Sequence, residues 1–268
     1  VLKRMLQPLR WLGDGVAGLS EGHLDVIVPK RSADEFGALT NAFNQMVGRV
    51  REMIAARDQL LLDVSHELRS PLTRMRVALE LLPQSRQRTA MAADVAEMGR
   101  MIAELLELER LRGGRAVIPV RQDLVSILHE VAEGFQNDPP GVRVVSSSPE
   151  ILVEVDGEKL RTVLRNLLEN AMKYSFPQSH PVEVSAARTD ETVVVRVTDH
   201  GPGIPESDRE RLFEPFFRID RSRTKSTGGY GLGLSISKRI VEAHGGTIGV
   251  ENNAGPGATF TLTLPQSA

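Results

Sequence analysis

Cysteine is absent from the 268-residue chain, which excludes disulfides, thiolate zinc sites and cysteine nucleophiles. Aromatic residues make up only 4% of the chain. That scarcity is typical of long helices that pack through Leu, Met, Val and Ala, because such seams need few rings. A large excess of one charge is also missing: the chain has 33 Lys and Arg and 35 Asp and Glu, and its formal net charge is -2. We therefore expect no nucleic-acid partner.

Long apolar runs are missing too. None approaches the roughly 18–20 residues that span a bilayer, and no signal peptide is visible. The N-terminal segment nevertheless carries Lys3, Arg4 and Arg10 ahead of any acidic residue. A basic start of this kind is typical of a sequence that begins just inside a membrane segment, on the cytoplasmic side. We expect a soluble, cytoplasmic portion of an inner-membrane protein whose transmembrane region is missing; the alternative is an arbitrary boundary in a soluble protein.

Heptad seams, in which apolar residues recur three and four positions apart, dominate the N-terminal part. They cover residues 2–19, 36–53, 61–82 and 91–105, with an extended connector at residues 23–29. The first two helices cannot bury their seams alone, whereas a parallel four-helix dimer would bury both, so we expect a homodimer. The rhythm breaks near Arg57, which predicts local unwinding at residues 54–60 where a signal could act.

Gly113-Gly114 ends the last seam and is expected to be a hinge. Beyond it, alternating apolar residues mix with amphipathic stretches, which predicts a layered α+β domain. Asp123 and Asp156 are each expected to cap a helix. The expected strands lie near residues 117–120, 142–145, 151–155, 182–187, 192–198, 247–251 and 258–264, and the expected helices near residues 123–135, 156–174 and 234–244.

The segment SHELRSPL contains a histidine with chemically useful neighbours. On a helix, His66 points away from the apolar seam, as an ordinary surface residue also would. Glu67 could hold one ring proton and leave the other nitrogen as a nucleophile. Ser70 lies one turn further on the same face. Pro71 lacks an N–H, so we expect a bend beside the histidine.

A second polar stripe runs along the segment NLLENAMKYS. Asn166, Asn170 and Lys173 share one flank of the expected helix, beside its apolar stripe. Two amides and a lysine make an edge of oxygen ligands and positive charge that suits Mg²⁺ and phosphate. A solvated polar flank would have the same spacing.

Two glycine-rich segments follow. Asp199 in DHGPGIP comes directly after a strand and is a simple acceptor for an exocyclic adenine amine, although a tight turn uses the same residues. In TGGYGLGLSI, glycines precede a helix whose free N–H groups can hold anions. A dinucleotide-binding loop is excluded, because basic, turn-like residues rather than a long strand precede the glycines.

The segment SHELRSPL resembles the histidine-phosphorylation box of bacterial two-component sensor histidine kinases. The later segments resemble the nucleotide-binding boxes of that family in the same order, so the resemblance spans Ser65 to Phe260. It implies a phosphoacceptor at His66, an assisting acid or base at Glu67, and a hydroxyl at Ser70 that supports phosphatase activity. Thr or Asn is usual at that last position, so Ser70 departs from the pattern.

The same resemblance implies an ATP and Mg²⁺ site in the C-terminal domain. Asn170 would contact Mg²⁺, Asp199 would accept the adenine amine, and Arg218 in FEPFFR would reach phosphate, while the phenylalanines of that segment would pack under a lid. The other implied ATP-binding residues are Asn166, Lys173, Tyr174, Gly201, Gly203, Gly229, Gly231, Gly233, Leu234 and Thr259. The histidines other than His66 are interpreted as structural or surface residues.

Residues 1–56 resemble a HAMP signal-relay domain. We therefore expect an all-α HAMP domain, a dimeric four-helix phosphoacceptor bundle at residues 57–112, and an α+β layered ATP-binding domain of the Bergerat type at residues 113–268. The resemblance implies a kinase that phosphorylates His66 and passes the phosphoryl group to an aspartate of a response regulator. Two alternatives remain: an ATPase of the same fold without a histidine acceptor, and a non-enzymatic dimeric relay.

Overall fold

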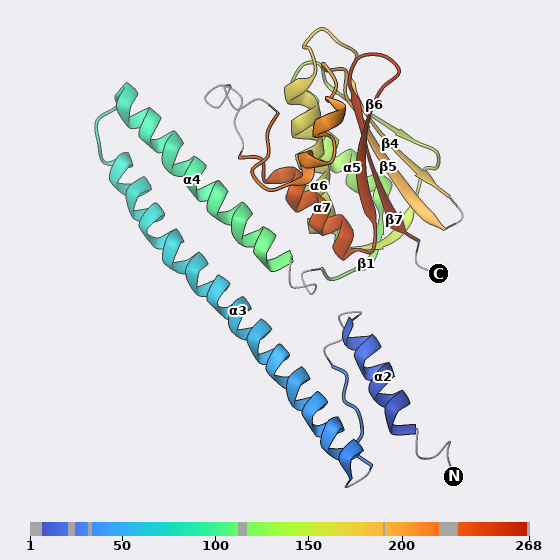
Figure 1. The fold of residues 1–268 in the computed structure, drawn as a ribbon. Helices are drawn as coiled ribbons and strands as arrows, with labels where there is room; N and C mark the ends of the chain where they lie inside the picture. The colour runs from blue at the N-terminus through green and yellow to red at the C-terminus, as the bar shows by residue number, and fades with distance from the viewer. Residues whose placement is uncertain are drawn as a thin grey trace. The chain divides into compact units, whose positions relative to one another are not determined.

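The computed structural model describes residues 7–20, 25–31, 34–111, 117–189, 191–219 and 230–266. The chain forms two compact units, Val1–Pro71 and Leu72–Ala268, and the division falls inside one long helix. Figure 1 shows the helical N-terminal part and the layered domain of helices and strands that follows. The predicted fold class is thereby confirmed, whereas the predicted Gly113-Gly114 hinge lies outside the described residues.

The first unit contains helix α2 (Gln7–Ser20), an extended segment at residues 25–31 and the first part of helix α3 (Glu35–Glu80). Asp34 caps α3, because its carboxylate accepts hydrogen bonds from the N–H groups of Phe36 and Gly37. A small core joins the three segments and consists of Leu12, Val28, Phe43 and Val47. The Asn44 side chain fastens the extended segment to α3 by pairing with both the N–H and the C=O of Val28.

Helix α3 differs from the prediction in its length. It runs from Glu35 to Glu80 without interruption, through residues 54–60 and through Pro71. The slip in the heptad at Arg57 therefore changes which face is apolar but does not end the helix. Main-chain hydrogen bonding continues across such a slip because it does not depend on which side chains face a partner. The break in the heptad thus does not interrupt the helix, and the local unwinding of a coiled coil at residues 54–60 stays a prediction.

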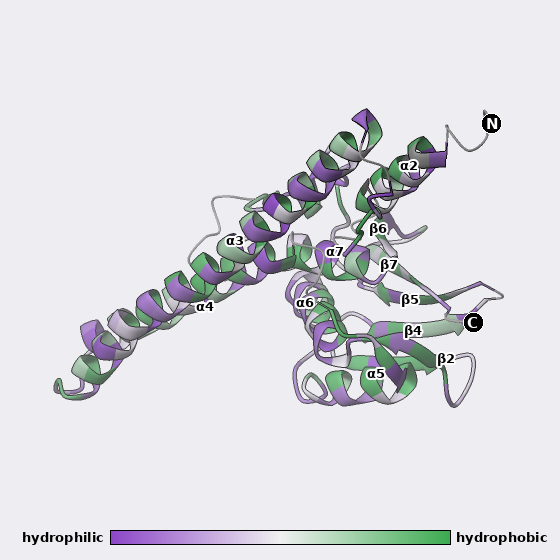
Figure 2. Cartoon of the chain, turned by 90° about the horizontal axis from the view of Figure 1, so that it is seen from below, coloured by the Kyte–Doolittle hydropathy of each residue, from purple (hydrophilic) through white to green (hydrophobic). Residues whose placement is uncertain are grey.

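Much of the predicted seam surface is exposed in the single chain. Within the first unit, Leu39, Met46 and Met53 are 50%, 46% and 72% exposed, although their seam partner Phe43 is buried. Figure 2 shows hydrophobic residues interspersed with hydrophilic ones along α3 and along helix α4 (Arg86–Leu111). One copy of the chain therefore leaves many of the apolar residues that its own heptads place on these helices exposed.

The second unit contains two sheets within its described residues. Strands β1 (Val120–Asp123) and β3 (Leu152–Val155) pair antiparallel. The larger sheet has the order β2-β4-β5-β7-β6, in which β2 and β4 are parallel and the other neighbours are antiparallel. Its strands are β2 (Val142–Ser146), β4 (Val182–Arg188), β5 (Thr192–Thr198), β6 (Thr247–Asn252) and β7 (Ala258–Pro265). The expected strand at residues 117–120 lies three residues later, where it pairs with β3.

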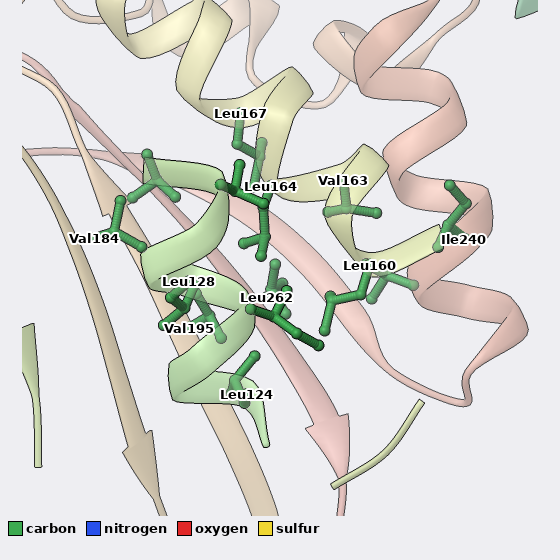
Figure 3. Close-up of a cluster of buried hydrophobic side chains, with 14 of the residues drawn as sticks. Leu124, Leu128, Leu160, Val163, Leu164, Leu167, Val184, Val195, Ile240 and Leu262 are labelled. Atoms are coloured by element: carbon green, nitrogen blue, oxygen red, sulfur yellow. The ribbon is translucent and has the colours of Figure 1, made fainter. Parts of the chain in front are cut away.

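Helices α5 (Leu124–Glu133), α6 (Gly157–Tyr174) and α7 (Gly233–Ala243) cover one face of the larger sheet. Asp123 and Asp156 cap α5 and α6 as predicted, since their carboxylates accept hydrogen bonds from N–H groups of the first turns. Figure 3 shows side chains of α5, α6 and α7 meeting those of the central strands, with Leu164 and Leu262 among them. Alternate residues of β4, β5 and β7 are buried, so one face of the sheet supplies the core.

Helix α4 extends beyond its predicted seam and joins this core. Leu108 and Leu111 in its last turns are buried in the same cluster as the side chains of α6 and α7. Glu107 of α4 forms an ion pair with Lys159 at the start of α6. The last turns of α4 are thus packed as part of the layered domain.

Candidate functional site

His66 lies on α3 in the first unit and is exposed, as are Glu67 and Ser70. Ser65, by contrast, is buried, and its hydroxyl donates to the main-chain oxygen of Leu61 at 2.6 Å. This orientation follows from the helical period, which turns successive residues by about 100°. The imidazole of His66 is therefore accessible to a phosphoryl donor.

A cavity of about 730 Å³ lies in the second unit at the C-terminal end of α6. Ten of its lining residues belong to the set implied by the resemblance: Asn166, Asn170, Lys173, Tyr174, Asp199, Gly203, Arg218, Gly231, Gly233 and Leu234. They come from α6, from the loop after β5, from the segment before α7 and from α7 itself. Residues that lie far apart in the sequence thus converge on one concave surface.

The two asparagines of α6 have different roles. Asn166 Nδ2 donates to the main-chain oxygen of Gly233 at 3.1 Å and to Ser237 Oγ at 3.3 Å, which fastens α6 to the start of α7. Among the described residues, no hydrogen-bond partner is recorded for the side chain of Asn170, which faces the cavity. An amide oxygen left available beside Glu169 is a suitable ligand for Mg²⁺, so this part of the cavity fits that ion.

Two cations that line the cavity, Lys173 and Arg218, lie near each other. Burial and the positive charge of Arg218 lower the pKa of Lys173. The Lys173 ammonium also lies 5.1 Å from the centre of the Tyr174 ring. Mutual repulsion of this kind is relieved by an anion, and a polyphosphate carries the charge to do so.

Asp199 follows β5 and is 6% exposed. Its Oδ1 accepts hydrogen bonds from the N–H groups of Gly201 at 2.9 Å and Ala258 at 3.1 Å. Burial raises the pKa of Asp199, and these two hydrogen bonds and the nearby His200 oppose that rise. Among the described residues, none donates a hydrogen bond to Asp199 Oδ2, so this oxygen is available to accept one from a ligand N–H.

The glycines near the cavity serve two purposes. Gly203 and Gly231 line it, and both have positive φ, at 77° and 79°. Gly201 does not line the cavity: a Cβ there would lie 2.6 Å from the main-chain oxygen of Tyr174. Glycine at 201 thus permits close packing of the loop against α6, rather than the approach of a nucleotide that the sequence suggested. Gly229 lies outside the described residues.

Thr259 faces away from the cavity, which its strand neighbours Ala258 and Phe260 line instead. Its hydroxyl donates to Asn253 Oδ1 at 2.7 Å and lies 3.0 Å from the hydroxyl of Thr198. The expected ligand contact of Thr259 is not supported by this geometry. The strict alternation along β7 could have revealed this, because Phe260, Leu262 and Leu264 point inward.

The sequence did not indicate that α4 contributes to the cavity. Glu97, Arg100 and Glu104 of α4 line it, and Glu97 accepts a hydrogen bond from Tyr230. Burial raises the pKa of Glu104, Arg100 opposes that rise and Glu169 adds to it. In the sequence these three residues have the pattern of an ordinary polar helix face. Only the packing of α4 against the layered domain identifies them as lining residues of the cavity.

The segment FEPFFR was only partly understood. Phe213 packs against the core, although packing under a lid was expected, and Arg218 lines the cavity. Phe217 lines the cavity as well, contrary to the expectation that these rings avoid the ligand. Phe216 is 52% exposed and has a positive φ of 64°, a conformation that non-glycine residues rarely adopt.

The other described histidines have no catalytic arrangement. His244 Nε2 accepts a hydrogen bond from the N–H of Asp156 at 2.9 Å, and its Nδ1 lies 2.7 Å from the main-chain oxygen of Ile240. It therefore joins the end of α7 to the start of α6. The rings of His180 and His200 meet edge to face, with their centres 5.8 Å apart. His129 is exposed.

These features define an ATP-binding domain of the histidine kinase type preceded by a helical histidine box. The family described as "Histidine kinase-, DNA gyrase B-, and HSP90-like ATPase" matches residues 155–268. The "His Kinase A (phospho-acceptor) domain" matches residues 56–114, and the "HAMP domain" matches residues 1–52. The chain belongs to the two-component sensor histidine kinases.

Curated relatives agree with this assignment. BaeS of Escherichia coli, a signal transduction histidine-protein kinase, is 31% identical over 97% of this chain and 58% of its own length. The sensor-like histidine kinase SenX3 of Mycobacterium tuberculosis is 35% identical over 97% of this chain and 65% of its own. The sensor histidine kinase MtrB of Mycobacterium leprae is 31% identical over 99% and 50%. The chain thus spans between half and two-thirds of the length of these relatives.

Solved structures support the same fold. The full-length kinase ShkA in complex with AMPPNP aligns with a TM-score of 0.65 at 29% identity, over 78% of this chain and 46% of that one. The Acinetobacter baumannii histidine kinase AdeS aligns with a TM-score of 0.54 at 22% identity, over 76% of this chain and 98% of that one. The ATPase family and the AMPPNP complex support ATP binding by the layered domain. None of the helices in the described ranges is both long and apolar enough to cross a membrane.

Proposed function

We propose that this chain is the kinase portion of a membrane sensor that phosphorylates itself on His66 from Mg-ATP and passes the phosphoryl group to an aspartate of a response regulator. The observation that carries the proposal is the presence, in one chain, of an exposed His66 beside Glu67 and of a cavity that gathers Asn170, Lys173 and Asp199. A nucleotide pocket alone would equally suit an ATPase, and an exposed histidine alone would be a surface residue.

Different groups in the lining of the cavity suit the two ends of ATP. Asp199 Oδ2 would accept the adenine amine, and Lys173 and Arg218 would face the phosphates. The oxygen of Asn170 would hold Mg²⁺, which supplies charge neutralisation for the triphosphate when bound. Phosphoryl transfer depends mainly on such positioning and neutralisation, because little covalent chemistry is asked of the protein.

In the first transfer, a ring nitrogen of neutral His66 attacks the γ-phosphorus in line. The N–P bond forms while the bond between that phosphorus and the bridging oxygen of ADP breaks. Glu67 takes the proton from the other ring nitrogen, so the imidazole does not retain a positive charge. In the second transfer, a carboxylate oxygen of the regulator attacks the phosphorus and the N–P bond breaks, while Glu67 returns the proton to the ring so that His66 leaves as a neutral imidazole. Ser70 would support phosphatase activity toward the phosphorylated regulator.

The partners follow from the exposed surfaces and the family. We propose a homodimer through the exposed apolar residues of α3 and α4, a cognate response regulator as phosphoryl acceptor, and attachment to a membrane through a region outside this sequence. Exposed seam residues on both helices support the dimer, and the HAMP and phosphoacceptor matches support the signalling role.

Incubation of the chain with γ-labelled ATP and Mg²⁺ tests the proposal. The wild type should acquire acid-labile, base-stable label, and His66→Ala should acquire none while its ATP affinity stays unchanged. His129→Ala removes another exposed histidine and should be labelled normally. Label retained in His66→Ala, or ATP hydrolysis without any labelled protein, would contradict the proposal.

A further inference from the structure

Two consecutive asparagines at the end of β6 hold the loop that carries Asp199. Asn252 pairs with both main-chain groups of Ile204: its Oδ1 accepts from the N–H at 2.8 Å, and its Nδ2 donates to the C=O at 2.9 Å. Ile204 and the adjacent Gly203 line the cavity. A paired amide of this kind fixes both the position and the plane of the main chain it binds.

Asn253 holds the other end of the loop. Its Nδ2 donates to the main-chain oxygen of Asp199 at 2.9 Å and to that of Pro256 at 3.2 Å. Its Oδ1 accepts from the Thr259 hydroxyl at 2.7 Å. The opposite amide orientation would place two oxygens face to face, so the partners determine which end donates. Because the Thr259 hydroxyl donates its proton to Asn253 Oδ1, the Thr198 hydroxyl must be the donor in the hydrogen bond between the two threonines.

The main chain around Asp199 leaves little freedom for any other arrangement. A Cβ on Gly257 would lie 2.0 Å from the main-chain oxygen of Asp199. The turn between β6 and β7 therefore approaches the main chain of Asp199 as closely as glycine allows. The N–H of Ala258 also donates to Asp199 Oδ1. The N–H groups of Ala258 and Gly201 therefore hold the carboxylate through Oδ1, and Asp199 lines the cavity.

We propose that Asn252 and Asn253 are positioning residues that set the purine selectivity of the ATP site. Asn253 fixes the Asp199 end of the loop, and Asn252 fixes its Ile204 end. A carboxylate oxygen attracts the 6-amino group of adenine and repels the 6-oxo group of hypoxanthine or guanine. That discrimination requires a carboxylate that cannot turn away, because a mobile one would relieve the repulsion. The inference rests on the proposed function, in which Asp199 faces the base.

The test compares Mg-ATP with Mg-ITP, which carries a 6-oxo group on an otherwise similar purine nucleotide. Dissociation constants are measured for the full chain and for Asn253→Ala, Asn253→Asp and Asn252→Asp. Asn253→Asp keeps the acceptor for Thr259, removes the donor to the main-chain oxygens of Asp199 and Pro256, and adds a negative charge. We expect each variant to reduce the preference for ATP over ITP by about tenfold, chiefly through tighter ITP binding or weaker ATP binding at an unchanged fold.

Two controls keep the result interpretable. Thr263→Val removes the hydrogen bond between the hydroxyls of Thr247 and Thr263 at the other end of the same hairpin, and it should leave the ratio unchanged. Thr259→Val removes the hydroxyl that donates to Asn253 Oδ1 and leaves both asparagines in place. It should reduce the preference for ATP over ITP by a smaller factor than the asparagine variants do. It also tests the proposal if Asn253→Ala fails to fold. Circular dichroism establishes that each measured variant is folded.

Asp199→Asn separates this inference from the proposed function. If Asp199→Asn loses the preference for ATP while folded asparagine variants and Thr259→Val keep it within about twofold, the positioning role is overturned and the adenine site stands. If Asp199→Asn itself keeps the preference, the assignment of Asp199 to the base is wrong, and both proposals that use it fall.

Discussion

The two units of this chain bury their apolar residues to very different degrees. The first unit has one small cluster, centred on Leu12, Val28, Phe43 and Val47, and leaves seam residues such as Met53 exposed. The second unit has an extensive core in which Leu164 and Leu262 are fully buried. A layered domain closes its own core, whereas a helix with a heptad seam needs a partner to cover it. The second unit is therefore stabilised by its own packing, and we expect the first unit to depend on the proposed association for the burial of its seam.

Truncating the core of the second unit should have the largest effect. Leu164→Ala removes a side chain that is 0% exposed and lies between α5, α6 and the sheet. We expect a loss of about 2–5 kcal/mol in the free energy of unfolding of that domain. Denaturation followed by circular dichroism measures it. Leu39→Ala, at a 50% exposed seam position of the first unit, should leave the transition of the second unit in place; equal losses would contradict the comparison.

Charging the exposed seam should have the next largest effect, on association rather than on the fold. Met98 of α4 is 46% exposed in the single chain. Met98→Glu would place like charges against each other in a dimer, so we expect a dimer that dissociates at micromolar concentration. Sedimentation equilibrium measures this. Gln87→Glu adds the same charge at an exposed position outside the seam and should leave the dimer intact; a wild-type chain that is already monomeric would contradict the prediction.

Because helix α3 is continuous, the rotational phase of the heptad seam at residues 36–53 is maintained along the helix as far as His66. Deleting residues 57–60 changes the phase of the two seams relative to each other, whereas inserting seven residues at the same place preserves it. We expect the deletion to hold the ratio of kinase to phosphatase activity at one extreme and the insertion to leave it nearly unchanged. Both activities are measured with the cognate regulator. Identical behaviour of the two variants would mean that helical phase is not the signal.

The smallest expected effect concerns Glu104, where α4 meets the cavity. Its pKa is raised above the ordinary value of 4.5 by burial, so folding favours the protonated form. The stabilisation is present below that value and is lost as pH rises through the raised pKa. At neutral pH, Glu104→Gln should therefore stabilise the second unit, by less than about 1 kcal/mol because water screens this half-buried group. Unfolding curves at pH 4 to 8 should show the advantage of the variant shrinking at the acidic end.

Local patterns predicted most of the layered domain. Asp123 and Asp156 cap helices because a carboxylate before an amphipathic stretch satisfies free N–H groups of the first turn, which is a property of a few neighbouring residues. The strands β4 and β5 followed from strict alternation. The candidate residues Asn170, Lys173 and Asp199 came from short segments, and the fold brings them together.

Two of the differences involve contacts with residues distant in the sequence. Gly201 was assigned to the ligand, but the main chain of Tyr174 requires it. Thr259 was assigned to the ligand, but Asn253 and Thr198 bind its hydroxyl on the other side of the sheet. The break in the heptad near Arg57 is a local feature of the side chains, and the helix continues through it because its own main-chain hydrogen bonds maintain it.

By itself, the sequence determined the order of the three domains, the histidine box and the set of polar residues from which the cavity is built. Those features depend on residue types at short spacings, because helix caps, heptads and glycine turns are local. Only the tertiary structure decided that the last turns of α4 pack with the layered domain, that Glu97, Arg100 and Glu104 line the cavity, and that Asn252 and Asn253 hold the Asp199 loop. These contacts join segments separated by tens of residues, and burial against a folded core is what brings them together.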